Sequence, residues 1–206
     1  MKNTKELILN TALALFNTEG LSKVTLRTIA NTMGISQGNL TYHYKKREAI
    51  IEALYFRLVS RIEEKMAENP TPKIELKTLF GISTIIMESF FEYRFFMLDF
   101  VQIMRENAPI KAHYSQLTLR REEQFVALFQ LLVADGVLQQ EILPNEYLYL
   151  YKRFQILGDF WISSATVTKE SLTKEMLQEY STIINQAIFP YLTDIGKKQY
   201  HEVVQT

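Results

Sequence analysis

MGISQGNLTYHYKKREAI, residues 33–50, contains the turn that decides the fold. Gly34 can adopt the left-handed conformation in which many helices end, and Ser36 can cap the helix that follows. Ile35, just before that cap, is spaced to pack against Leu40. The pattern predicts two short helices joined by a tight turn, which is a helix-turn-helix.

The residues before this turn predict two helices. From Lys5 to about Thr18, apolar residues recur at i, i+4, i+7 and i+8, and the run stops at Gly20. The helix that leads into the turn has Thr25 as its expected N-cap, because a threonine hydroxyl can accept from the free N–H groups there. Together with the helix after the turn, these segments make a three-helix unit.

The outward positions of the helix after the turn carry no large aliphatic side chain. Glutamine and asparagine can hydrogen-bond to base edges in the major groove of DNA, threonine can offer a methyl or a hydroxyl group, and glycine lets the backbone come close. The free N–H groups at the start of the helix suit a phosphate. The outward positions are Gln37, Gly38, Asn39, Thr41 and Tyr42.

Lys45, Lys46 and Arg47 stand where a fourth helix is about to begin. Exposed cations at a helix N-terminus oppose the helix dipole by about 0.3–1 kcal/mol each. A DNA backbone would favour them, because each phosphate that is neutralised releases counterions. Tyr42 and His43, just upstream, could add hydrogen bonds to phosphate. The alternative is a basic turn that is simply solvated.

The charge of the chain is divided unevenly along its length. The net charge is zero, with 23 basic and 23 acidic residues. Residues 1–50 hold seven Lys and Arg against three acidic residues, a balance of +4, so residues 51–206 carry −4. A polyanion would therefore prefer the N-terminal segment.

The composition argues against several other classes of protein. Zero cysteines exclude a disulfide framework, a thiol nucleophile and a thiolate metal site. The three histidines, His43, His113 and His201, lie far apart, and the chain has no Gly-rich phosphate loop, so we expect no catalytic site, metal or cofactor. The apolar run at 125–134 is much shorter than the ~20 residues of a membrane span. We expect no membrane contact and a cytoplasmic location.

We expect an all-α fold, because the chain has only seven glycines and five prolines and no convincing alternating strand. Residues 1–48 should form the helix-turn-helix domain and residues 49–206 a larger helical domain, with a helix at about 46–68 connecting them. NPTP, residues 69–72, is the clearest break, since each proline disfavours helix in the residue before it. Further helices are expected at roughly 73–92, 94–107, 109–134, 145–166 and 170–193, followed by a polar tail.

The segment from about Ile8 to Leu54 resembles the DNA-binding domain of TetR-family (tetracycline-repressor-like) transcriptional regulators. The resemblance rests on ALALFNTEGLSKVTLRTIA, then MGISQGNLTYHYKKREAI, then a long fourth helix, and it covers about the first quarter of the chain. It implies phosphate contacts by Thr25, Ser36, Tyr42, His43 and Lys46, with base contacts mainly by Gln37, Gly38, Asn39 and Thr41. Thr41 stands where the family often has an aromatic residue, which leaves the base preference at that position open.

The two helices expected at 145–166 and 170–193 are strongly apolar. The first carries an apolar seam and, on a further side, Tyr149, Ile156 and Phe160, whereas a surface helix needs only one apolar face. TetR-like proteins pair their last two long helices into a four-helix interface, so the resemblance implies a homodimer through these helices. A core helix of a monomer is the alternative. Two reading helices related by a twofold axis could occupy major grooves about 34 Å apart on palindromic double-stranded DNA.

The stretch FFEYRFFMLDF, residues 90–100, holds more aromatic side chains than one helix face can hide in a simple core. We therefore expect a cavity for a small effector between the helices at 73–92 and 145–166. Arg94, Arg105 and His113 are possible polar anchors, and plain core packing is the alternative for each residue. The candidate lining residues are Phe91, Phe95, Tyr114, Phe129, Tyr151 and Trp161.

Together these features predict a ligand-responsive, sequence-specific DNA-binding transcriptional regulator. We expect a repressor that leaves a palindromic operator when a small hydrophobic or aromatic ligand binds, since a ligand shifts a protein toward the state that it binds better. A constitutive DNA-binding protein without an effector and a helical enzyme are the alternatives.

Overall fold

The structure is a computed structural model that describes residues 2–68, 75–169 and 171–204. Over these residues the chain is α-helical, and its only β-type pairing there is an isolated bridge between Leu138 and Leu192. The prediction of an all-α fold is confirmed. The break at NPTP lies outside the described residues.

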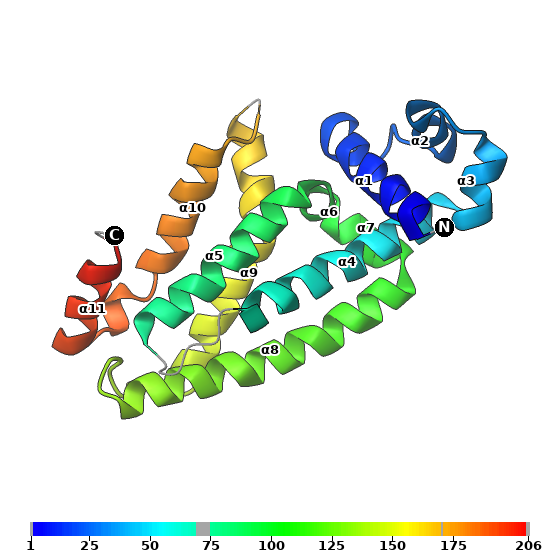
Figure 1. The fold of residues 1–206 in the computed structure, drawn as a ribbon. Helices are drawn as coiled ribbons and strands as arrows, with labels where there is room; N and C mark the ends of the chain where they lie inside the picture. The colour runs from blue at the N-terminus through cyan, green and yellow to red at the C-terminus, as the bar shows by residue number, and fades with distance from the viewer. Residues whose placement is uncertain (1, 69–74, 170, 205–206) are drawn as a thin grey trace.

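The first three helices form a small unit at one end of the molecule (Figure 1). They are α1 (Lys2–Glu19), α2 (Leu26–Met33) and α3 (Gln37–His43). The long α4 (Arg47–Glu68) leads from this unit into the body of the protein, as Figure 1 shows in cyan. We call α1–α3 the head and the elements that follow α4 the body.

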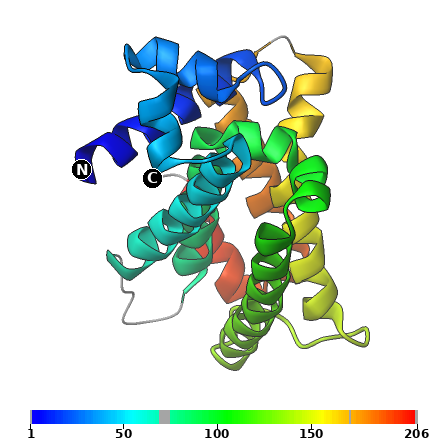
Figure 2. The same ribbon diagram turned by 90° about the vertical axis from the view of Figure 1, so that its right-hand side faces the viewer.

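Helices α5 and α8 of the body pack against α4, which lies along one side of the molecule (Figure 2). The long α8 packs against α9, and α10 packs against α5 and α9. The elements of the body are α5 (Leu76–Glu92), α6 (Arg94–Leu98), α7 (Phe100–Glu106), α8 (Ala108–Ala134), α9 (Glu146–Thr168), α10 (Lys174–Gln186), the 3-10 helix η1 (Phe189–Tyr191) and α11 (Asp194–Val204).

Two expected helices are interrupted in the structure. The helix expected at 94–107 is divided into α6 and α7 at Asp99, with no glycine or proline to mark the break. The helix expected at 170–193 ends at Gln186, and a 3-10 turn that contains Pro190 follows. A proline lacks the N–H group that continues an α-helix, which explains the second interruption.

The expected polar tail is wrong for residues 194–204, which form α11. Tyr200 of this helix is buried, and its ring packs edge-on against Phe80 of α5 and Phe189 of η1. A single buried face on a short helix is a weak signal in a sequence that also carries Lys197, Lys198 and Glu202.

The hydrophobic core is continuous from the head into the near part of the body. One cluster of buried residues extends from Ile8 of α1 through Leu40 of α3 and Leu54 of α4 to Trp161 of α9. A second cluster at the far end gathers α5, α8, α9 and α11 around Phe129. Because head and body share the first cluster, a change of packing in the body can reach the helix-turn-helix.

Candidate functional site

Side-chain caps and one glycine set the geometry of the turn between α2 and α3. The Thr25 hydroxyl accepts a hydrogen bond from the Thr28 backbone N–H at 3.1 Å, which fixes the start of α2. Gly34 ends α2 in the left-handed conformation with φ of 67°. The Ser36 hydroxyl accepts from the Asn39 N–H at 3.1 Å and caps α3. Both caps and the left-handed glycine are confirmed, because each depends only on residues close in sequence.

The outer face of α3 is exposed to solvent in the single chain. Gln37, Gly38 and Asn39 are exposed, while Leu40 is fully buried and anchors the helix on the head. Tyr42 is 74% exposed. The three exposed positions at the start of α3 can therefore approach another surface without any rearrangement of the fold.

Two candidate DNA-binding residues on α3, Thr41 and His43, already make contacts within the chain, which limits the groups that they can offer to an outside partner. The Thr41 hydroxyl donates to the Gln37 carbonyl at 2.7 Å, which leaves its methyl group and a lone pair for an outside partner. His43 is partly buried, and its ring meets the Tyr42 ring edge-on at 5.3 Å. The Ser36 hydroxyl accepts an N–H group of its own helix and keeps its proton to donate, whereas the Thr25 hydroxyl also shares a hydrogen bond with the Thr28 hydroxyl at 3.0 Å.

The cations after α3 differ in their surroundings. Lys45 and Lys46 are exposed, and neither has an ion-pair partner among the described residues. Arg47 instead donates to the Leu21 carbonyl at 3.0 Å and fastens the start of α4 to the loop before α2. The expectation that all three cations need a partner outside the fold is therefore wrong for Arg47, whose partner lies far away in sequence.

A cavity of about 190 Å³ lies in the body between α4, α5, α8 and α9, with α6, α7 and α10 completing its wall. This position agrees with the expected one between the helices at 73–92 and 145–166. Most of the wall is apolar, for example Leu58, Ile86 and Phe100. Of the six candidate lining residues, Tyr114 and Tyr151 line this cavity.

The other four candidate lining residues pack in the core and lie outside the wall of the cavity. Phe95 stacks on Phe16 of α1, with ring centroids 5.0 Å apart. Phe129 is fully buried in the far cluster. Phe91 and Trp161 stack on each other, with centroids 6.4 Å apart. For these four residues, core packing is the correct alternative.

The three candidate polar anchors are also outside the wall of this cavity. The Arg94 guanidinium lies over the ring of Phe91, 5.8 Å from its centroid, and Arg105 is exposed. His113 is closer to the cavity, because its Nδ1 hydrogen-bonds at 2.8 Å to the hydroxyl of Tyr55, a lining residue.

The polar side chains of the wall include a hydrogen-bonded cluster of three residues, two of which the sequence interpretation missed. The Tyr114 hydroxyl donates to Oδ2 of Asp159 at 2.6 Å, and Nε2 of Gln155 donates to the same hydroxyl at 3.3 Å. Asp159 is only 7% exposed, and burial raises the pKa of its carboxyl group to about 6. Its position four residues after Gln155 and eight after Tyr151 placed it on the inner face of α9, which was the available signal.

Comparison with known sequences agrees with both parts of this arrangement. The family described as "Bacterial regulatory proteins, tetR family" matches residues 8–54, which contain the helix-turn-helix. The family described as "TetR: Bacterial transcriptional repressor" matches residues 57–200, most of the body. The chain belongs to the TetR family of transcriptional regulators.

Individual TetR-family relatives are distant in sequence. The HTH-type transcriptional regulator YerO of Bacillus subtilis strain 168, itself uncharacterised, is 28% identical over 134 residues. That match covers 61% of this chain but only 45% of YerO, so the chain spans less than half of the length of this relative.

Solved structures share the TetR fold over nearly the whole chain. A TetR-family regulator from Marinobacter aquaeolei VT8 superposes with a TM-score of 0.86 at 21% identity, covering 98% of this chain and 97% of that one. A transcriptional regulator from Saccharomonospora viridis, solved in complex with choline, has a TM-score of 0.72 at 18% identity and covers 92% of this chain and 97% of that one.

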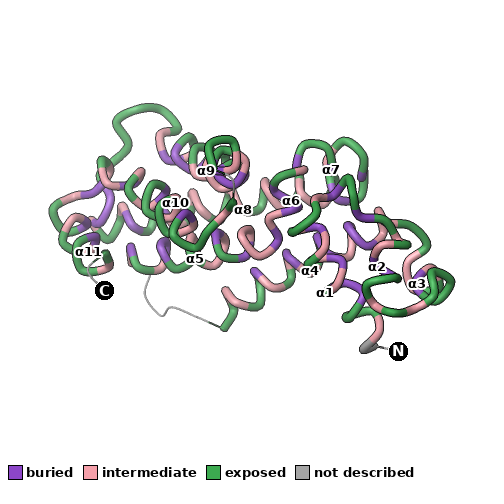
Figure 3. Tube along the Cα trace, turned by 90° about the horizontal axis from the view of Figure 1, so that it is seen from above, coloured by how far each residue is buried: buried purple, intermediate pink, exposed green. Residues whose placement is uncertain are grey.

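In this TetR-family protein the outer side of α9 carries an apolar stripe. Tyr149, Ile156 and Phe160 are 53%, 61% and 41% exposed, and they follow one another at helical spacing. Figure 3 shows exposed and buried stretches alternating along the trace of α9. Ile183 of the neighbouring α10 is exposed as well. The second apolar face expected for this segment therefore lies mainly on the surface, with the Phe160 ring also packing edge-on against the core residue Phe100 at 6.0 Å.

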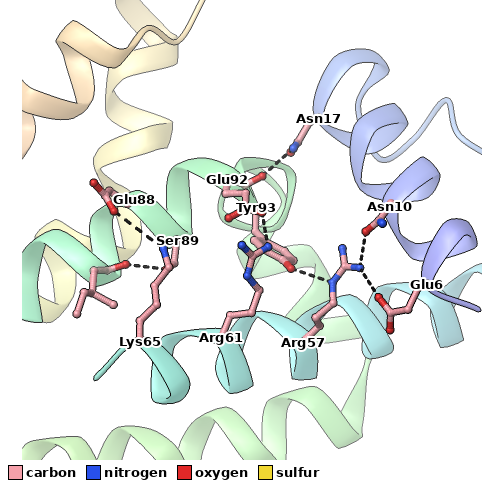
Figure 4. A network of polar contacts seen from close by, with 11 residues as sticks. Glu6, Asn10, Asn17, Arg57, Arg61, Lys65, Glu88, Ser89, Glu92 and Tyr93 are labelled. Carbon is pink, nitrogen blue, oxygen red and sulfur yellow. Dashed lines mark hydrogen bonds and ion pairs between the residues drawn. The ribbon is translucent and has the colours of Figure 1, made fainter. Parts of the chain in front are cut away.

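Polar contacts hold the head to the turn between α5 and α6 (Figure 4). Asn17 of α1 donates to the Glu92 carbonyl at 2.8 Å and accepts from the Phe95 N–H at 3.1 Å. Asn17 thereby satisfies backbone groups where two helices of the body meet, next to the stacked rings of Phe16 and Phe95. The orientation of the head thus depends on the position of this turn.

Two arginines of α4 extend the same network. Arg57 donates to the Asn10 side chain of α1 at 2.8 Å and to the Tyr93 hydroxyl at 2.9 Å, so one guanidinium joins three elements. One turn further on, Arg61 pairs with the carboxylate of Glu92 (Figure 4). Since α4 also lines the cavity, the network forms a physical connection between the cavity wall and the head.

Proposed function

We propose that this TetR-family regulator is a homodimeric repressor that releases a palindromic operator when a small ligand enters the cavity of the body. The observation that carries the proposal is the exposed outer face of α3, which includes Gln37 and Asn39, together with the two exposed lysines that follow this helix, Lys45 and Lys46. Side chains of these types can read base edges, while cations beside them hold the DNA backbone. The protein would act in the cytoplasm, where it meets the DNA.

The base-reading role is assigned to Gln37, Gly38, Asn39 and Thr41. Phosphate contacts are assigned to the caps and to the residues that follow α3, namely Thr25, Ser36, Tyr42, His43 and Lys46. The division between the two groups follows the resemblance to the TetR family. Exposure is compatible with both roles, because every residue of the two groups is exposed or partly exposed. Phosphate contacts position the protein, and base contacts give it specificity.

A dimer is supported by the exposed stripe on α9. One α3 of seven residues can reach only a few base pairs, whereas two copies related by a twofold axis can read successive major grooves. Pairing α9 and α10 with the same helices of a second copy would cover Tyr149, Ile156, Phe160 and Ile183, which otherwise remain in water.

Ligand control is supported by the course of α4. Tyr55, Leu58 and Ile62 of this helix line the cavity, and the same helix leads to the head. A ligand that favours a different position of α4 would change the separation of the two heads, within the limit set by its differential affinity for the two states. A regulator of the same fold has been solved in complex with choline.

The test starts from fragments of the organism's own genome. Purified protein should retain a small set of duplexes at low ionic strength, and the retained sequences should share a palindrome. A panel of small apolar and aromatic compounds should then release the retained duplex. Retention of no duplex would contradict the DNA-binding proposal, and retention without release by any compound would favour a constitutive DNA-binding protein.

The variant Gly158→Leu tests whether compounds release the duplex by binding in the cavity. Gly158 lines the cavity, and a Cβ added there meets no atom within 4 Å, so a leucine side chain has room to occupy the space of a ligand. The variant should bind the retained duplex as the unaltered protein does, but compounds should no longer release it. Undiminished release would mean that compounds act from another site.

A further inference from the structure

We propose that the ligand of the cavity carries a positively charged amine on an apolar body, with Asp159 as its counter-ion. This inference rests on the proposed function, since it assumes that the cavity binds an effector, and it adds the chemical class of that effector. The ligand is defined by two features of the wall, its apolar surface and its single buried carboxyl group.

The charged side chains of the wall leave one charge without a partner. Arg121 and Asp159 are the charged residues among those that line the cavity. Arg121 pairs with Glu63 of α4 at 3.6 Å and donates to Gln124 at 3.0 Å. The guanidinium group of Arg121 therefore already has a counter-ion within the protein. No ion pair to Asp159 occurs among the described residues.

The neighbours of Asp159 support it with hydrogen bonds but supply no charge. Tyr114 and Gln155 are neutral, and they lower the pKa of the carboxyl group less than burial raises it. The group therefore ionises near pH 6 and is mostly anionic at pH 7.5. A buried carboxylate without a countercharge is costly, and a ligand cation at hydrogen-bond distance would offset that cost.

Aromatic rings in the wall of the cavity favour the same occupant. Phe100 lies edge-on to Tyr114 at 5.1 Å, and Tyr55 stacks on Phe96 at 5.3 Å, all four in the wall. The faces of such rings attract an ammonium group, and their surfaces attract an apolar body. An anionic ligand would be repelled by the like charge of Asp159. A neutral ligand would leave the carboxylate without a countercharge.

The test uses three probes with one apolar body and different head groups: 4-phenylbutylamine, 4-phenylbutan-1-ol and 4-phenylbutanoate. Each displaces the neutral dye N-phenyl-1-naphthylamine from the full-length protein at pH 7.5. The amine should compete at least ~10-fold more strongly than the alcohol, which corresponds to about 1.4 kcal/mol, and the carboxylate should compete least.

Asp159→Asn keeps the shape of the side chain and removes its charge. In this variant the preference for the amine over the alcohol should fall to within about threefold, while the affinity for the alcohol stays the same. Asp135→Asn, at an exposed position after α8, is the matched control and should keep the full preference. A purely structural role of Asp159 would change the binding of all three probes alike.

Each remaining outcome contradicts the inference. If the dye and the alcohol bind but the amine has no advantage, or if Asp159→Asn keeps the advantage, the cavity binds ligands without using this charge. The proposed function would then stand and the inference would fall. If neither the dye nor any probe binds, the inference and the proposed ligand control fall together.

Discussion

Replacing Asp159 by asparagine should make the unliganded protein more stable at neutral pH. Burial raises the pKa of this carboxyl group from 3.8 to about 6, because the folded protein disfavours its charged form. Asparagine cannot ionise, and its carbonyl oxygen can still accept the hydrogen bond from Tyr114. The variant therefore removes the cost of the charge and keeps the contact.

The size and pH dependence of the effect follow from the pKa of the two states. Well below pH 4 the carboxyl group is protonated in both the folded and the unfolded state, so it does not change the free energy of unfolding. As the pH rises from about 4 to 6, the unfolded state ionises first, and the folded protein loses stability relative to the variant. The expected difference in free energy of unfolding is about 1.5 kcal/mol at pH 5 and about 3 kcal/mol at pH 8, with the variant more stable.

Urea unfolding followed by tryptophan fluorescence measures this difference. Trp161 is the single tryptophan, is 2% exposed and lies two residues after Asp159, so it reports on this part of α9. Asp135→Asn should have the same free energy of unfolding as the unaltered protein at both pH values, because Asp135 is exposed. The reasoning would be refuted if the difference in free energy of unfolding between Asp159→Asn and the unaltered protein were equal at pH 5 and pH 8. It would also be refuted if Asp159→Asn were the less stable protein at pH 8.

Three further predictions concern the turn, the basic residues and the surface of α9. Gly34→Ala should lower the free energy of unfolding by about 1–2 kcal/mol, because alanine disfavours the left-handed conformation of this position. The added Cβ itself meets no atom within 4 Å, so no steric clash contributes. Urea unfolding measures this loss, and an unchanged stability would contradict the prediction. Lys46→Ala should weaken binding to all duplexes alike and lower the salt dependence of binding by about one ion, which titrations at several salt concentrations measure; a loss restricted to one duplex would exclude a phosphate contact. Ile156→Glu should convert a dimer to a folded monomer in light scattering, because Ile156 is exposed in the single chain, and a persistent dimer would place the interface elsewhere.

The local geometry of the head could be predicted from the sequence because it depends on neighbouring residues. Thr25 and Ser36 cap helices whose N–H groups lie three residues away, and Gly34 adopts a conformation that few other residues tolerate. The exposed stripe on α9 was predictable for a similar reason, since helical spacing assigns Tyr149 and Ile156 to one side. These features need no knowledge of the tertiary structure.

The residues of the cavity could be predicted only in part, because a void is a property of the whole arrangement. Helical spacing places Phe129 and Tyr151 on inner faces, but only the packing of neighbouring helices decides that Tyr151 borders a cavity and Phe129 fills the core. The role of Arg47 depends in the same way on a carbonyl 26 residues away in sequence. Asp159 could not be predicted from the spacing of apolar residues, because it is a carboxyl group on the inner face of α9, which is otherwise without charge.

The affinity of Asn39→Ala for DNA tests the central claim, that the outer face of α3 reads base pairs. Two duplexes of equal length are needed, one retained from the genome and one of scrambled sequence. We predict a loss of about 1–3 kcal/mol on the retained duplex and no change on the scrambled one, because Asn39 is exposed and carries no charge. Equal losses on both duplexes, or no loss on either, would contradict the account.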